Sequence, residues 1–157
     1  MEKLKVGGII KVPRLSQLGV MSAPDRPGIA GAVFEALGDA QINAQFIVQC
    51  VDLRKRSHVI LCVGREDMPA ALEILRKVKD EIQAEDLTCC EDVAIISVFG
   101  PDFRERPGIS GPIFAALAAH GINIRAISTS ISTVSCVIDE DKLEKAEEAL
   151  AERLDLP

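Results

Sequence analysis

Residues 26–43 of this chain read RPGIAGAVFEALGDAQIN, and residues 106–123 read RPGISGPIFAALAAHGIN. Ten of the eighteen positions are identical at a constant offset of 80 residues, whereas unrelated stretches of average composition share about one. A match of this length at a fixed spacing indicates an internal duplication. The chain is therefore predicted to contain two copies of one structural module.

The length of the chain agrees with two small modules. Its 157 residues divide at the repeat into a first module over residues 13–90 and a second over residues 91–157. Hydrophobic residues make up 48% of the sequence, which suits a packed core and argues against disorder. A module of about seventy residues buries a modest share of its surface, so we expect the two modules to share an interface and to dimerise.

The charge and the aromatic content argue against a nucleic-acid partner. The net charge is −6, there is no Trp or Tyr, and there are five Phe, whereas nucleic acid favours a basic face and stacking aromatics. The one basic run, residues 54–56, is expected to be a solvated hairpin loop rather than an anion site. The sequence has no signal peptide and no apolar segment of bilayer length, so we expect a soluble, cytoplasmic protein with no membrane partner.

Apolar periodicity and turn residues predict the elements of the first module. A strand at residues 15–22 leads into a Pro-Gly turn and a helix whose Ile29, Val33 and Leu37 share one face. The other predicted elements are strands at 43–51 and 57–63, a helix capped by Asp67 with Pro69 in its first turn and Leu72, Leu75 and Val78 inward, and a strand at 84–90.

The second copy repeats the same order of elements. They are a strand at 93–100, a helix from about Pro107 to Ala119, strands near 123–130 and 134–138, and a last helix opened by Asp141 with Leu143, Ala146, Leu150 and Leu154 inward. Strand-helix-strand-strand-helix-strand is the order of a ferredoxin-like α+β fold, with antiparallel strands and both helices on one face of the sheet. We therefore predict two ferredoxin-like βαββαβ modules.

The second module ends after its last helix, so its closing strand is missing from that end of the sequence. The first module is preceded by a spare strand at residues 4–12, which Pro13 separates from the next strand. An open sheet edge is an aggregation hazard. We therefore expect the N-terminal strand to complete the second module.

The repeated Pro-Gly turn predicts a small-molecule site. Proline presets the first helical turn, and glycine lets the backbone approach a partner. The free N–H groups and the helix dipole then favour a carboxylate or phosphate. Asp25, just before the first turn, could accept hydrogen bonds from an ammonium group. A site for a carboxylate beside a site for an ammonium group would fit an α-amino acid. The alternative is that Pro27-Gly28 only starts a helix that Asp25 caps.

The motifs resemble the tandem ACT regulatory region of aspartokinase over nearly the whole chain. The residues that carry the resemblance are Asp25-Arg26-Pro27-Gly28, Ile42-Asn43, Ile47-Val48-Gln49, Pro107-Gly108, Ile122-Asn123-Ile124 and Ile127-Ser128-Thr129-Ser130. The resemblance implies βαββαβ modules that pair side by side, with lysine or threonine held between them to inhibit a kinase. It also implies which residues line the two pockets.

Carried over by position, the first pocket would use Asp25, Gly28, Ile29, Ala30 and Gln49, closed by Asn123 and Ile124 of the partnering module. The second pocket would use Gly108, Ile109 and Ser110 with Asn43, and Thr129 and Ser130 at its edge. The alternative role for Asn43 and Asn123 is to cap the turn between helix and strand.

The sequence departs from the family pattern at three places. In the second copy, the turn before Arg106 carries Glu105, with Asp102 earlier. An acidic residue that usually follows Ser-Thr-Ser is missing, because Ile131 follows Ser130, and His58 replaces an aspartate on the third strand of the first module. The second pocket would then lack a carboxylate for an amine, which argues against lysine there. His58 is expected to cap or pack against the sheet rather than to act as a proton switch, and His120 to be a helix C-terminal residue.

The sequence contains no catalytic set of residues. Two separated histidines and five cysteines without C-x-x-C spacing form no catalytic triad, Cys-His pair or metal cluster, and most of the cysteines are expected to be reduced core residues. There is no room for a nucleotide-binding kinase domain. We therefore predict no enzyme, no cofactor and no metal.

Two hypotheses follow for the function. In the first, the chain is a homodimeric amino-acid sensor that regulates amino-acid metabolism, acting on a partner enzyme or serving as a regulatory subunit of aspartokinase. In the second, it is a ferredoxin-like scaffold or small enzyme that binds no amino acid. A homodimer is expected because apolar strand edges are hard to leave exposed.

Overall fold

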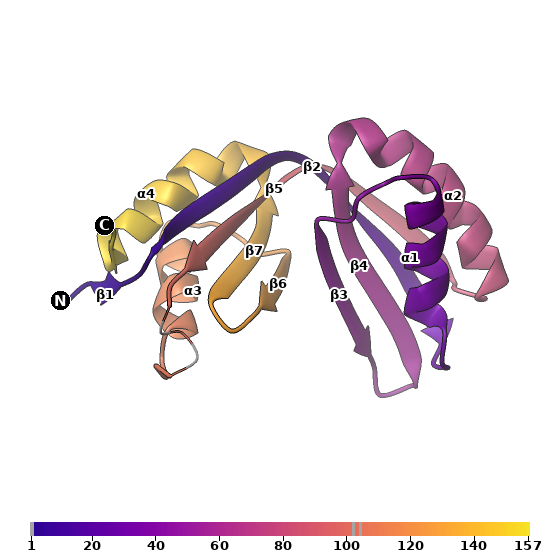
Figure 1. Cartoon of the computed structure of the whole chain (residues 1–157), viewed down its shortest axis with the longest axis horizontal. Helices are drawn as coiled ribbons and strands as arrows, with labels where there is room; N and C mark the ends of the chain where they lie inside the picture. Colours follow the sequence, from indigo (N-terminus) through magenta and orange to yellow (C-terminus); the bar gives the residue numbers. More distant parts are fainter. Residues whose placement is uncertain (1, 102, 104) are drawn as a thin grey trace. The chain divides into compact units, whose positions relative to one another are not determined.

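A computed structural model describes residues 2–101, 103 and 105–157. The chain forms two compact units, each with its own pair of helices and its own core (Figure 1). We call Leu15–Glu91 module one, and Met1–Arg14 together with Asp92–Pro157 module two. Each module is described by itself below.

Module one is a four-stranded antiparallel sheet with two helices on one face (Figure 1). The strand order is β3-β4-β2-β5, and β3 and β4 form a hairpin in which Phe46 lies opposite Cys62. Apolar side chains such as Leu18, Leu61, Val33 and Leu75 pack between sheet and helices. The elements are β2 (Gly8–Pro24), α1 (Ile29–Asp39), β3 (Phe46–Val51), β4 (Arg56–Gly64), the 3-10 turn η1 (Arg65–Asp67), α2 (Met68–Glu81) and β5 (Asp86–Phe99).

Module two repeats this architecture with strand order β2-β5-β7-β6. Its core joins Ile96 and Ile138 of the sheet to Leu117 and Leu150 of the helices. The additional elements are β1 (Leu4–Lys5), α3 (Ser110–Ala119), β6 (Ala126–Thr129), β7 (Thr133–Asp139), the 3-10 turn η2 (Glu140–Lys142), α4 (Leu143–Arg153) and β8 (Leu154–Asp155). The predicted fold class, two ferredoxin-like modules, is thereby confirmed.

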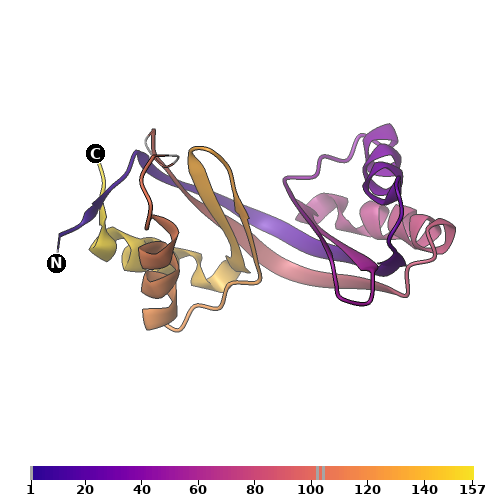
Figure 2. The ribbon, with the colours of Figure 1, turned by 90° about the horizontal axis from the view of Figure 1, so that it is seen from below.

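The N-terminal segment completes module two, as the sequence predicts. The Gly7 N–H donates to the Phe99 carbonyl at 2.7 Å, and β1 pairs in parallel with β8. Val6 is buried in the core of this module. Figures 1 and 2 show both termini at the same end of module two.

Two strands are longer than expected. β2 runs without interruption through Pro13, and β5 joins the two strands predicted on either side of Asp92. Proline lacks an N–H and disrupts a central strand, but β4 pairs with β2 only from Leu15 onward. Pro13 therefore lies where β2 is an edge strand, and an edge tolerates it. The residues at the module boundary, Arg14 and Asp92, have φ of 61° and 60°.

The helical periodicity identified the buried faces correctly in most places. Ile29, Val33 and Leu37 are the buried residues of α1. In α2 the buried set is Ala71, Leu75 and Val78, with Leu72 only partly buried. Asp67 occupies the N-cap position of α2, as predicted, but makes no side-chain capping bond. The buried face of α4 also differs from the prediction. Its buried residues are Ala146, Ala149 and Leu150, and Leu143 is partly buried.

Candidate functional site

The two Pro-Gly turns have the same backbone geometry. Gly28 and Gly108 have φ of 98° and 83°, a region that L side chains rarely adopt. A Cβ at Gly28, Gly31, Gly108 or Gly111 would meet nothing within 4 Å. Each helix therefore begins beside open space, with its first N–H groups available to a ligand.

Asp25 stands at the entrance to the first turn with its carboxylate unengaged. Its backbone N–H donates to the Lys55 carbonyl at 3.1 Å, and its side chain is exposed. Within the described part of the chain the carboxylate has no hydrogen-bonding or ionic partner. The alternative in which Asp25 caps α1 is therefore not what the structure has.

The other expected residues of the first pocket contribute in different ways. Ile29 is 2% exposed and belongs to the core, so it can offer a ligand its backbone but not its side chain. Ala30 is half-buried. The Gln49 amide donates to the Ser57 hydroxyl at 2.9 Å, and Ser57 lies opposite Ala23, at the end of β2 that leads into the turn.

In module two the structure brings five of the expected residues to one cavity. It has a volume of about 400 Å³, and its lining consists of Gly108, Ile109, Ser110, Thr129 and Ser130 together with Phe103, Arg106, Gly111 and Val134. Sequence reasoning missed Arg106, whose guanidinium also donates to the Lys5 carbonyl at 2.8 Å. Its place directly before the repeated Pro-Gly was the available signal. No carboxylate lies among these lining residues.

Asn43 and Asn123 occupy equivalent turns after α1 and α3. Both are exposed, and the turns are closed by backbone bonds, from the Ile42 N–H to the Leu37 carbonyl at 2.9 Å and from the Ile122 N–H to the Leu117 carbonyl at 3.0 Å. Neither asparagine caps its turn through a side-chain hydrogen bond to a described residue. The closure of each pocket by Asn43, or by Asn123 and half-buried Ile124, stays a prediction.

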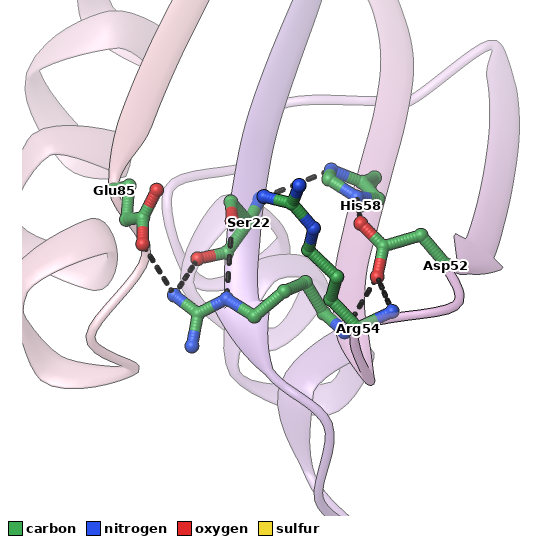
Figure 3. A network of polar contacts seen from close by, with 6 residues as sticks. Ser22, Asp52, Arg54, His58 and Glu85 are labelled. Atoms are coloured by element: carbon green, nitrogen blue, oxygen red, sulfur yellow. Dashed lines mark hydrogen bonds and ion pairs between the residues drawn. The ribbon is translucent and has the colours of Figure 1, made fainter.

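A polar network beside the first turn centres on His58 (Figure 3). The Ser22 N–H donates to His58 Nδ1 at 3.1 Å, and His58 Nε2 lies 2.9 Å from Asp52 Oδ2. Because a backbone N–H can only donate, Nδ1 accepts, which leaves Nε2–H to donate to the carboxylate. The backbone N–H groups of Arg54 and Arg56 donate to Asp52 Oδ1 at 2.8 and 3.0 Å. The expectation that His58 has a structural role agrees with these contacts.

These hydrogen bonds shift the titration of Asp52. The bond from His58, followed by that from the Arg56 N–H, lowers the pKa of Asp52 below its ordinary value of 3.8. The lowered pKa keeps the carboxylate ionised, so it accepts from all three donors at neutral pH.

Arg56 extends the network to Glu85, the residue before β5. Its Nε donates to the Ser22 hydroxyl at 3.1 Å, and its terminal nitrogen contacts the Ser22 carbonyl and the Glu85 carboxylate, the latter at 3.1 Å. The Glu85 N–H donates in turn to the carbonyls of Met21 and Ser22. The basic run is thus a solvated loop only in part, because Arg56 is structural.

The cysteines divide into two groups. Cys62 and Cys136 are buried, and burial raises the pKa of the two thiols to about 12 and about 11. Cys50 and Cys89 are exposed and Cys90 is half-buried, so the expectation of core cysteines is wrong for these three. The described residues contain no group of three or more His, Cys, Asp or Glu side chains that could hold a metal ion. They also form no helix long and apolar enough to cross a bilayer.

Comparison with known families assigns each module separately. A model of the ACT domain matches residues 16–80, and a second ACT-domain model matches residues 96–154. Both matches lie within the modules that the structure defines. This is therefore a tandem ACT-domain chain.

Similar proteins come from one enzyme system. The aspartokinase of Corynebacterium efficiens is 30% identical over an alignment of 158 positions, which covers 99% of this chain and 38% of that protein. The ligand-free regulatory subunit of aspartate kinase from Thermus thermophilus has a TM-score of 0.86 and 31% identity, covering 96% of this chain and 99% of that one. A structure of aspartokinase alpha and beta subunits has a TM-score of 0.86 and 34% identity, with coverage of 94% and 97%. The chain belongs to the ACT-domain family, among the regulatory subunits and regulatory regions of aspartokinases.

Proposed function

We propose that the chain is an amino-acid-binding regulatory protein of aspartate-family metabolism. The observation that carries the proposal is the first turn, where a carboxylate without a partner, that of Asp25, stands three residues before the open backbone at Gly28. An ammonium group suits the carboxylate, and a carboxylate suits the N–H groups at the start of α1. Together they are complementary to the common part of every α-amino acid.

The cavity of module two favours one kind of ligand side chain. Its cavity offers the hydroxyls of Ser110, Thr129 and Ser130 and the cation of Arg106, and its lining residues include no carboxylate. A lysine side chain would place a second ammonium beside Arg106 without compensation. We therefore favour threonine over lysine for this cavity.

The regulatory output would pass through protein partners. A homodimer in which modules pair side by side would let Asn43, Asn123 and Ile124 close the pockets. The two similar structures are those of a regulatory subunit and of alpha and beta subunits of aspartokinase, so a catalytic aspartokinase chain is the first candidate partner. The chain itself would supply no catalysis and would act in the cytoplasm.

A thermal-unfolding panel against the twenty amino acids tests the proposal. A ligand at a hundred times its dissociation constant stabilises the folded state by about 2.7 kcal/mol, which raises the melting temperature by several degrees. We expect threonine to give the largest shift.

The matched pair Asp25→Ala and Asp39→Ala tests the module-one site by calorimetry. Both carboxylates are exposed, but Asp39 lies at the far end of α1. Asp25→Ala is expected to weaken binding about tenfold or more, and Asp39→Ala to leave it unchanged. If no amino acid shifts the melting temperature, the proposal fails. The hypothesis of a scaffold that binds no amino acid is then favoured.

A further inference from the structure

The segment that carries Asp25 is fastened at both ends by one hairpin. At its start, Ser22 has φ of 61°, and the β2 register shifts between Val20 and Ala23. His58 holds this bulge through the Ser22 N–H (Figure 3). Arg56 of β4 holds it through the Ser22 hydroxyl. At its end, the Asp25 N–H donates to the Lys55 carbonyl at the tip of the same hairpin.

The hairpin tip is shaped by Asp52. The Asp52 N–H donates to the Arg56 carbonyl at 2.9 Å, and the Lys55 N–H donates to the Asp52 carbonyl at 3.1 Å. The Asp52 carboxylate accepts the N–H groups of Arg54 and Arg56. The tip packs little apolar surface, since Leu53 is fully exposed, so these hydrogen bonds fix the position of the Lys55 carbonyl.

Among the residues that the structure describes, the hairpin of module two differs from that of module one. Phe46 and Cys62 are paired sixteen residues apart, whereas the matching pair in module two, Ala126 and Val137, is eleven apart. The β3–β4 hairpin is therefore five residues longer. By the same strand register the counterpart of His58 is Thr133, which has no imidazole to receive a backbone N–H.

We propose that Asp52, Arg56 and His58 are positioning residues that hold Asp25 in place and so set the amino-acid affinity of module one without touching the ligand. The reason is that the Asp25 carboxylate has no partner in its own module, so the backbone of residues 22–25 alone fixes the position from which this side chain extends. This inference rests on the proposed function for its consequence in binding. Its structural half, the fixing of residues 22–25, stands without a ligand.

Amide hydrogen exchange in the ligand-free protein tests the structural half. His58→Leu removes both hydrogen bonds of the ring and is expected to speed exchange of the Ser22 and Asp25 amides by about tenfold or more. His58→Gln should lie close to wild type, because its amide oxygen can accept from Ser22 and its NH₂ can donate to Asp52. His120→Leu is the matched control, since His120 forms a similar pair with Glu152 in module two. It should leave both amides unchanged.

Calorimetry with threonine and with lysine tests the consequence in binding. Coupling through such networks changes affinity by roughly two- to thirtyfold, and we expect a loss in this range at the module-one site for His58→Leu, rescue by His58→Gln and no change for His120→Leu. If His58→Leu does not fold, Asp52→Asn takes its place with the same expected loss.

The outcomes separate the two claims. Unchanged exchange at Asp25 in a folded His58→Leu or Asp52→Asn protein overturns the inference, and so does faster exchange with unchanged affinity. If wild type binds neither amino acid at module one, the binding consequence is overturned together with the proposed function there, and the exchange data alone then decide whether the network fixes Asp25.

Discussion

Gly28 and Gly108 are required by backbone geometry and not by lack of space. Both lie in the left-handed region, where a non-glycine residue is strained, while the volume in front of each turn is open. A residue that must be glycine for its φ, and that also keeps the approach to a helix N-terminus clear, serves folding and recognition together. This double requirement accounts for the Pro-Gly pair at the same place in both copies.

Replacing Gly28 and Gly31 by alanine should change the free energy of unfolding in opposite directions. Gly28→Ala is expected to destabilise the protein by about 1 kcal/mol, because alanine is strained at this φ. Gly31→Ala should stabilise it by about 0.5 kcal/mol, because Gly31 lies in α1 and alanine is the better helix former. Urea unfolding of the ligand-free protein measures both. A shift of the same sign for the two variants would contradict the backbone explanation.

The lowered pKa of Asp52 predicts a pH-dependent contribution to stability. A carboxyl group whose folded pKa lies below its unfolded value of 3.8 stabilises the fold above that value, and the contribution is lost as the pH falls through the folded pKa. Asp52→Asn should therefore be less stable than wild type at pH 7. The difference should shrink steadily below pH 3.8. Denaturant unfolding across this range checks it, and a difference independent of pH would exclude an ionic origin.

At the scale of elements, periodicity predicted the four helices and the main strands. It was wrong at Leu154, which was expected on the last helix but lies in the short strand β8. The face of α1 was correct because Ile29, Val33 and Leu37 repeat at helical spacing. The sequence could not predict that β2 continues through Pro13, because the cost of a proline depends on whether its strand has a neighbour on that side. The missing capping bond at Asp67 has a similar origin, since side-chain geometry decides a capping bond.

The N-terminal segment contains a matched pair for testing its role. Val6 is buried in module two, whereas Ile10 is 49% exposed. Val6→Ala removes two methylene equivalents and should destabilise this module by about 1.5 kcal/mol, while Ile10→Ala should change little. Hydrogen exchange resolved by residue should show faster exchange in β7 and α3 for Val6→Ala, with β4 and α1 unaffected. Faster exchange in β4 and α1 instead would show that the segment belongs to module one, which contradicts the prediction.

At the scale of the whole molecule, the repeat in the sequence predicted two modules, and the sequence order predicted that the N-terminal strand belongs to the second. The candidate site was less predictable. Its turns follow from the Pro-Gly motif. The network at Asp52 and His58 instead joins β2, β4 and the loop between β3 and β4, and no local pattern encodes that. Arg106 was missed because an arginine before proline has no fixed role until the cavity is seen.

Fragments provide a test of this division. Residues 15–91 form one contiguous unit and are expected to fold alone. Residues 92–157 lack the segment that supplies Val6, so they should fold only when a peptide of residues 1–14 is added. Circular dichroism with and without the peptide measures this, with a Val6→Asp peptide as the control. Equal folding with and without the peptide would refute the completing role.

The two parts of module two, residues 1–14 and 92–157, are synthesised at different times. In synthesis from the N-terminus, residues 1–14 leave the ribosome before their partners in β5 and β8. At translation rates of about 5–20 residues per second, this strand waits on the order of ten seconds, and module one can fold in the meantime. Residues 1–14 therefore remain without their partners in module two while module one is synthesised and can fold.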